Sequence, residues 1–308
     1  MRRGIGQALL SAALAMALAA GAGPGAAEEG ILSLPADLSG GAPIRAERSA
    51  DPEVYEDPTI RAELHMVGHR ENEYNVTYFY ATVTIGHASQ LRTASADRGG
   101  FLLGGTAPAR TIAGRVNAVL ALDGDFCDNY HLRERKKYCL RQGVVYRDTV
   151  TDYLDMLLID EDGDFHIYPA GPELAGRNKE EIGGKKIINA FQFGPALVID
   201  GEPVADEAIL DRAHSPATSE PDSKAARMCI GQTGPLQYLV LTNWYGLNLA
   251  QLRDLALSIA PCRTLYVLDG GNSAQLVWLK GQVNRNETNG RDITDIIYFA
   301  SAYFGDAE

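Results

Sequence analysis

Short apolar runs alternate with turns rich in Gly and Asp along most of the chain, a pattern that predicts strands more than helices. The segment 74–85 is dense in Val, Thr, Tyr and Phe, so it predicts a long strand. Residues 156–159 and 165–168 flank the acidic turn at 160–164, for which a β-hairpin is the simplest interpretation. The run at 196–199 and the Asp-Gly turn after it repeat that pattern, so a sheet-rich domain is expected.

An amphipathic helix is expected in the last third of the chain. Its apolar residues recur at helical spacing, and they are Leu249, Leu252, Leu255, Ala256 and Ile259. Asn248 can cap the start of this helix, and Pro261 prevents its continuation. Residues 106–117 are a second helix candidate. Few helices among many strands indicate an α+β fold, with a single large domain around a mixed β-sheet.

Two buried strands are each expected to deliver an aspartate and a glycine at their C-terminal end. Residues 118–122 and 264–268 are apolar, and the polar segments that follow them contain Asp123, Gly124, Asp125, Asp269, Gly270 and Gly271. Polar side chains at strand ends, beside glycines that let a ligand approach the backbone, commonly build a site. Adjacent glycines also leave backbone N–H groups uncovered, which suits an anion. Each segment taken alone is equally well explained as a tight turn.

Three arginines, Arg141, Arg227 and Arg291, are candidates for binding an anion, because a planar guanidinium suits bidentate binding of phosphate. An isolated arginine usually decorates a surface, but Arg141 and Arg227 adjoin apolar stretches, which favours a specific partner. Ser273 lacks the flanking GxSxG pattern of a serine nucleophile, so it is a candidate substrate contact instead.

Composition narrows the class of protein and of partner. The 308 residues suffice for one large domain or two small ones, and 45% of them are apolar, enough for a sizeable core. The formal net charge of -12 argues against nucleic acid or an anionic membrane surface as the main partner, although a local basic pocket for phosphate remains compatible with it. The acidic turn at 160–164 fails the EF-hand pattern, and no CxxC pair or HExxH motif is present. No metal or cofactor is therefore expected.

The N-terminal residues 1–27 are expected to be a secretory signal peptide. Arg2 and Arg3 precede an apolar run at 8–20, and small residues near position 25 offer a cleavage point. An uncleaved N-terminal anchor is the alternative, and no second hydrophobic span follows. Residues 28–58 are predicted to be an extended lead-in, and residues 59–305 the folded domain. The expected location is secreted or in the cell envelope.

The chain has four cysteines, Cys127, Cys139, Cys229 and Cys262. An even number in an exported chain suggests two disulfides, and sequence leaves three pairings open. We predict Cys127–Cys139, which would close a polar loop, and Cys229–Cys262, which would tie two probable core strands. A bridge over the short first loop would contribute about 3 kcal/mol in the chain-entropy model.

Eight segments in chain order, between Ile60 and Phe304, together resemble the phosphodiester glycosidase family. They are LRTASADRG (91–99), NAVLALDGDF (117–126), LRQGVVYRD (140–148), AFQFGPALVIDGE (190–202), RMCIGQTGPLQYLVL (227–241), GLNLAQLRDLA (246–256), LDGGNSAQLVW (268–278) and GRDITDIIYF (290–299). The resemblance implies a hydrolase that cleaves a glycosidic bond to a phosphate diester, with a carbohydrate or sugar phosphate as substrate.

The resemblance also implies roles for the candidate residues. Asp269, with Asp123 or Asp125, would supply the carboxylates around the anomeric carbon. The phosphate and sugar would be held by Arg141, Arg227, Arg291, Gly124, Gly270, Gly271 and Ser273. Asp123 stands where the family usually has Asn, and Asn272 and Ala274 stand where it usually has Gly and Ser. These departures keep two alternatives open, a catalytically impaired glycan-binding module on the same scaffold and, more remotely, a structural envelope protein.

Overall fold

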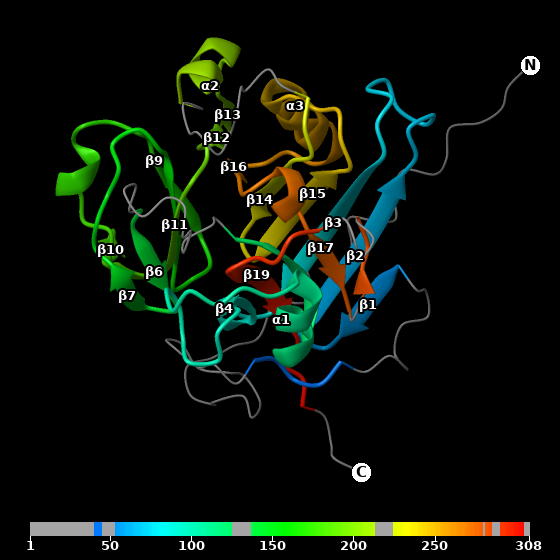
Figure 1. Cartoon of the computed structure of the whole chain (residues 1–308), viewed down its shortest axis with the longest axis horizontal. Helices are drawn as coiled ribbons and strands as arrows, with labels where there is room; N and C mark the ends of the chain where they lie inside the picture. Colours follow the sequence, from blue (N-terminus) through cyan, green and yellow to red (C-terminus); the bar gives the residue numbers. More distant parts are fainter. Residues whose placement is uncertain are drawn as a thin grey trace, which may run out of the picture.

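The computed structural model describes residues 40–44, 53–124, 137–212, 224–279, 281–284 and 290–304. In these residues the fold is mainly β, with three sheets and three α-helices (Figure 1). The helices are α1 (Ala109–Arg115), α2 (Asp206–Arg212) and α3 (Leu249–Ile259), and the short 3-10 helices are Ala88–Gln90, Leu174–Gly176 and Gly271–Ser273. No helix of the described residues is long and apolar enough to cross a membrane.

The largest sheet has eight strands, in the order β1-β2-β3-β15-β14-β16-β12-β13. Their bounds are β1 (Val54–Asp57), β2 (Ile60–Val67), β3 (Tyr78–Ile85), β15 (Gln237–Asn243), β14 (Met228–Gly234), β16 (Thr264–Val267), β12 (Ala196–Ile199) and β13 (Glu202–Pro203). The expected strand at 74–85 is shorter in the structure, because Asn75 has a φ of 54°, which lies outside the strand region.

A five-stranded sheet has the order β18-β17-β5-β19-β4, and a six-stranded sheet has the order β7-β6-β11-β8-β9 with β10 paired to β11. The five strands are β4 (Leu91–Ser95), β5 (Ala118–Asp123), β17 (Leu276–Trp278), β18 (Gly281–Gln282) and β19 (Asp295–Ala300). The six are β6 (Cys139–Arg141), β7 (Val144–Arg147), β8 (Met156–Asp160), β9 (Phe165–Tyr168), β10 (Glu181–Ile182) and β11 (Lys185–Gln192).

The expectation of one mixed sheet is wrong, although the α+β class agrees broadly with the structure. All strand pairings of the described residues are antiparallel. The connection through α3 explains this. It carries the chain from β15 to β16 with β14 between them, so these two parallel strands are not neighbours. One hydrophobic core joins the three sheets, since it includes Leu241, Leu122 and Phe191.

The predicted helix around residue 250 is confirmed as α3. The Asn248 side chain accepts a hydrogen bond from the Gln251 N–H, and the Gln251 side chain accepts one from the Asn248 N–H. This capping box starts the helix, and Pro261 follows its end. The second candidate at 106–117 forms the shorter α1, which begins after Pro108.

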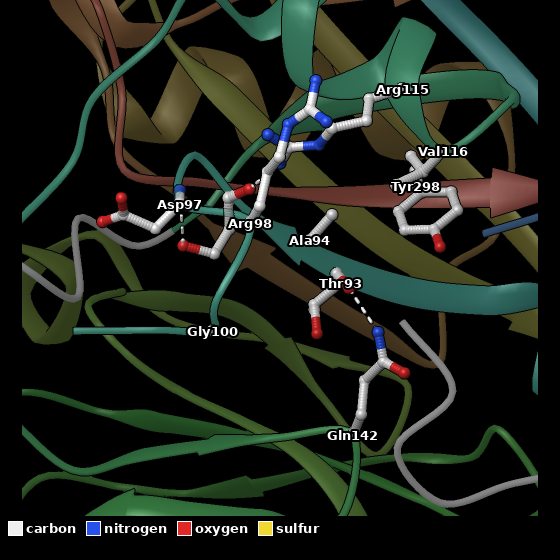
Figure 2. A pocket seen from close by; sticks show the side chains of 10 residues that line it. Thr93, Ala94, Asp97, Arg98, Gly100, Arg115, Val116, Gln142 and Tyr298 are labelled. Carbon is white, nitrogen blue, oxygen red and sulfur yellow. Dashed lines mark hydrogen bonds between the residues drawn. The ribbon is translucent and has the colours of Figure 1, made fainter. Parts of the chain in front are cut away.

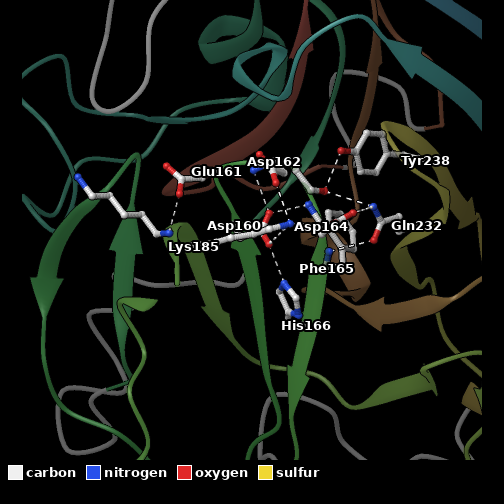
Figure 3. Close-up of polar contacts among 11 residues, drawn as sticks. Asp160, Glu161, Asp162, Asp164, Phe165, His166, Lys185, Gln232 and Tyr238 are labelled. Carbon is white, nitrogen blue, oxygen red and sulfur yellow. Dashed lines mark hydrogen bonds and ion pairs between the residues drawn. The ribbon is translucent and has the colours of Figure 1, made fainter. Parts of the chain in front are cut away.

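The acidic turn between β8 and β9 is a structural hairpin, as predicted (Figure 3). One Asp160 carboxylate oxygen accepts the N–H groups of Asp162 and Asp164 at 3.0 and 2.9 Å, and the other lies 2.9 Å from His166 Nε2. Burial acts to raise the pKa of Asp160, but the contacts to His166 and the turn N–H groups hold it below its ordinary value. Tyr238 donates to the Gly163 carbonyl at 2.9 Å and ties this turn to the largest sheet.

The predicted Cys229–Cys262 disulfide is wrong, because both residues are free, buried cysteines. Cys229 lies opposite Val267, and Cys262 precedes Val267 by five positions. The strand register therefore does not place the two cysteines opposite each other. Burial raises the pKa of the Cys262 thiol to about 12, which makes it unreactive. Cys139 is buried in β6, but its predicted partner Cys127 lies outside the described residues, so that pairing stays a prediction.

Candidate active site

The strand ends that carry Asp123 and Asp269 lie together in the structure. The Asp269 N–H donates to the Gly124 carbonyl at 3.2 Å, which fastens the end of β5 to the segment after β16. The Gly124 N–H in turn donates to the Asp295 carbonyl at 3.1 Å, at the start of β19. Asp123 at the end of β5, Asp295 at the start of β19 and Asp269 after β16 therefore lie around Gly124. Asp125, the third predicted carboxylate, lies outside the described residues.

Asp123 is a buried carboxyl group with one unpaired oxygen. Its Oδ1 accepts the Gln275 N–H at 3.0 Å, and its Oδ2 has no hydrogen-bond partner among the described residues. Burial first, and then the charges of Asp269 and Asp295, raise the pKa of Asp123 well above its ordinary value. This environment favours the neutral acid, whose O–H donates a hydrogen bond much as an Asn side chain does.

Asp269 differs from Asp123, because its carboxylate is fully paired. Oδ1 accepts the Gly270 N–H at 2.8 Å, and Oδ2 lies 2.8 Å from Arg291 Nη2. Arg291 Nε also donates to Ser273 Oγ at 2.5 Å. Asp269 is buried, whereas the Arg291 side chain is 47% exposed. A guanidinium at this boundary stabilises the Asp269 anion and still faces solvent, so it can meet an arriving anion.

Gly270 and Gly271 serve a different purpose from the predicted one. Their N–H groups are not left uncovered, since Gly270 N–H binds Asp269 and Gly271 N–H donates to the Ala226 carbonyl at 2.9 Å. A Cβ on Gly270 would lie 2.9 Å from that same carbonyl, and Gly271 has a φ of 59°. These glycines allow a close approach between the Asp269 loop and the strand that begins after Arg227.

Arg141 lies in a buried ion pair. Its Nε and Nη2 donate to one Asp295 oxygen at 3.2 and 3.1 Å, and its guanidinium carbon lies 4.0 Å from the centre of the Phe191 ring. Both charged side chains are essentially inaccessible to solvent. The Asp295 carboxyl also lies 2.5 Å from where a Gly124 Cβ would be, so only glycine fits there. The structure thus directs Arg141 toward Asp295 behind Gly124.

Arg227 directly precedes β14, a central strand of the eight-stranded sheet. Its N–H donates to Asn243 Oδ1 at 2.8 Å, and burial lowers the pKa of its guanidinium. Because β14 runs antiparallel to both β15 and β16, the start of β14 and the C-terminal ends of those two strands lie at the same end of the sheet. This arrangement brings Arg227 near the Asp269 loop, because the Leu268 and Gly271 N–H groups donate to the carbonyls of Met228 and Ala226. A shared phosphate site stays a prediction.

Several residues of this region carried no signal in the sequence. Asp295 and Gln275 sit in apolar stretches, and only their contacts with Arg141 and Asp123 show their importance. Trp244 and Tyr245 follow β15 at the same end of the sheet as Arg227. These two residues are 51% and 68% exposed to solvent. Exposed aromatic rings beside a polar site are suited to stacking on a ligand. Within the described ranges, no group of three or more His, Cys, Asp or Glu is arranged to hold a metal ion.

Two solved structures have a similar fold. The structure is similar to the zebrafish N-acetylglucosamine-1-phosphodiester alpha-N-acetylglucosaminidase catalytic domain auto-inhibited by pro-peptide, with a TM-score of 0.61 and 13% identity over 85% of this chain and 87% of that one. It is also similar to a hypothetical protein from Synechocystis, with a TM-score of 0.54 and 15% identity over 82% of this chain and 64% of that one. These likenesses show the fold.

No curated protein matches the sequence. The sequence model of the phosphodiester glycosidase family matches residues 116–300. This range is more than half of the chain and includes Asp123, Arg227 and Asp269. The chain therefore belongs to the phosphodiester glycosidase family.

Proposed function

We propose that this protein is a hydrolase that cleaves the glycosidic bond between a sugar and a phosphodiester, in glycans outside the cytoplasm. Membership of the family supports the glycosidase class. The observation that carries the proposal is the backbone contact through Gly124, which joins the strand end of Asp123, a buried carboxyl with one unpaired oxygen, to Asp269, which is paired with Arg291. Glycosidases commonly use two carboxyl groups, one as a protonated acid and the other as an anion.

The substrate chemistry sets what the site must supply. A phosphodiester is already a good leaving group, so the reaction needs less acid assistance than hydrolysis of an ordinary glycoside. It needs contacts to the phosphate, stabilisation of positive charge at the anomeric carbon, and a carboxylate. In the proposed reaction the bond from the anomeric carbon to the phosphate oxygen breaks, and a water oxygen takes its place. The products are a free sugar and a phosphate monoester.

Each candidate residue then has a role that its surroundings support. Asp269 is the carboxylate that faces the anomeric carbon, and Arg291 is paired with it at a distance of 2.8 Å. The unpaired Oδ2 of Asp123 is the donor to a sugar or phosphate oxygen, in place of the family's asparagine. Arg291 and Arg227 supply positive charge for the phosphate. Arg141 holds Asp295 behind Gly124 and so positions the backbone between the two carboxyl groups.

The location outside the cytoplasm is also a proposal, and it rests on residues 1–27. The two arginines, the apolar run and the small residues near position 25 are typical of a signal peptide. N-terminal sequencing of protein recovered from the medium or envelope of the producing cells tests it. A mature N-terminus near residue 28 is expected, and intact protein retained in the cytoplasm would contradict the proposal.

A glycan-binding module without catalysis is the second candidate. It is favoured by the departures from the family at Asp123 and Asn272, and by the Gly270 and Gly271 N–H groups, which already have protein partners. In that case the end of the sheet with Trp244 and Tyr245 would still hold a sugar.

Turnover of a chromogenic sugar 1-phosphodiester separates the two candidates. We expect the purified protein to release the chromogenic phosphate monoester, and glucose and N-acetylglucosamine derivatives compared side by side define the sugar. Binding of these compounds without turnover at any pH between about 4 and 8 would contradict hydrolysis and favour the binding module.

A further inference from the structure

A cavity of about 210 Å³ lies beside the end of β4 (Figure 2). Two arginines, Arg98 and Arg115, line it, together with the amide of Gln142. The rest of the lining is mixed. It has the apolar groups of Ala94, Val116 and Tyr298, the polar Thr93 and Ser95, Gly100, and the carboxylate of Asp97. None of these residues was a candidate in the sequence, and none belongs to the site around Asp269.

The two arginines leave an excess of positive charge at this cavity. Arg115 is anchored, since it donates to the carbonyls of Ser95 and Ala96, and the positive charge of Arg98 acts on it directly. Arg98 is exposed and makes no hydrogen bond or ion pair within the described ranges. The nearby Asp97 carboxylate accepts the Gly105 N–H at 2.7 Å. The protein as a whole has a net charge of -12, but this cavity has two guanidinium groups and one carboxylate. The local excess of positive charge favours the binding of an anion.

Gln142 places a buried side-chain amide in the wall of the same cavity. It is only 2% exposed, and its φ of 49° holds it in the left-handed region. Its Nε2 donates to the Thr93 carbonyl, whereas its Oε1 has no hydrogen-bond partner in the part of the chain that the structure describes. A buried acceptor without a partner costs about 1–3 kcal/mol, and a ligand hydroxyl group would remove that cost.

We infer that this cavity binds a saccharide that carries an oxyanion, a phosphate or a carboxylate. Arg98 and Arg115 contact the oxyanion, Gln142 Oε1 accepts a sugar hydroxyl, and the apolar lining contacts the ring. The cavity lies next to the proposed active site, because Ser95 pairs with Asp295 and Gln142 follows Arg141. The cavity would therefore hold a second, charged sugar of the same glycan. Binding there does not depend on hydrolysis at the proposed active site.

Calorimetric titration of the full chain with glucose 6-phosphate tests this inference, with glucuronate, glucose and inorganic phosphate as parallel ligands. We expect saturable binding of at least one of the two anionic sugars, and the better of them identifies the oxyanion. Arg98→Gln should weaken that binding about tenfold or more, whereas Arg70→Gln, the same charge change on the loop between β2 and β3, should not. Gln142→Leu should weaken binding of the anionic sugar but not of inorganic phosphate.

The controls separate this cavity from the proposed active site. Asp269→Asn and Arg227→Met should leave the binding unchanged, so a protein that fails to hydrolyse phosphodiesters can still confirm the cavity. Equal affinity for glucose and the anionic sugars, or an Arg98→Gln variant that binds like the parent, would overturn the inference. So would binding that is lost in Arg227→Met and kept in Arg98→Gln.

Discussion

Asp269 donates its N–H to the Gly124 carbonyl at 3.2 Å, and this bond joins two strand ends that are far apart in the sequence. It places the Asp269 carboxylate beside the buried Asp123, close enough for its charge to raise the pKa of Asp123. A buried acid with a raised pKa and a carboxylate paired with Arg291 therefore lie in one small region.

The first prediction concerns stability and pH. Because the pKa of Asp123 is raised on folding, the native state holds a proton that the unfolded state releases above about pH 4. The buried Asp123 therefore lowers the free energy of unfolding by an amount that grows as pH rises from about 4 toward the raised native pKa. Asp123→Asn should raise the melting temperature at neutral pH, with a gain that disappears below about pH 4. A melting difference that is the same at pH 4 and pH 7 would contradict the buried acid.

The second prediction concerns activity and pH. The parent enzyme should lose kcat/KM as pH rises and Asp123 loses its donor proton, so it should work best under acidic conditions. Asp123→Asn keeps a donor at every pH, and it should preserve or increase turnover and extend activity to higher pH. Abolished turnover in Asp123→Asn would mean that Asp123 transfers its proton to the leaving group.

The third prediction concerns the buried Arg141–Asp295 pair. Arg141→Met leaves Asp295 charged and unpaired in the interior, which should cost about 3–5 kcal/mol of unfolding free energy. The loss should appear in urea denaturation. The double variant Arg141→Met with Asp295→Asn should recover part of that loss, because no buried charge remains. An Arg141→Met variant as stable as the parent but inactive would instead assign Arg141 to the phosphate.

The fourth prediction compares the two arginines near Asp269. Arg291→Gln should lower kcat/KM by about tenfold or more, because it removes both a phosphate contact and the partner of Asp269. Arg227→Met keeps the apolar stem and removes only the donors, so it should also lower kcat/KM. Steady-state kinetics on a sugar phosphodiester and thermal melting of both variants provide the check. A variant that melts like the parent and keeps full activity excludes its arginine from the site.

Local features of the fold were predictable because neighbouring residues determine them. Asn248 and Pro261 fix the ends of α3, and the turn at Asp160 is closed by the amides of the next few residues. Apolar runs that end in Asp-Gly likewise indicated Asp123 and Asp269 as strand-end residues. For these elements, the composition and order of adjacent residues carry the necessary information.

Long-range contacts were not predictable in the same way. Arg141 and Asp295 are 154 positions apart, and their pairing depends on the packing of two different sheets. The separation of Cys229 from Cys262 depends on strand register, and the antiparallel sheets depend on where the α3 connection inserts β16. The partners of Gly270 and Gly271 were missed for the same reason, since the Ala226 carbonyl approaches from another strand.

Turnover by Asp269→Asn tests the central claim most directly. The substitution keeps the size of the side chain and an acceptor for the Gly270 N–H, but it removes the charge that is paired with Arg291. The measurement is release of the phosphate monoester from a sugar 1-phosphodiester by the parent and the variant, with thermal melting of both. We predict that the variant melts as a folded protein and that its turnover falls to background. A folded Asp269→Asn variant with the parent's activity would contradict the assignment of the active site.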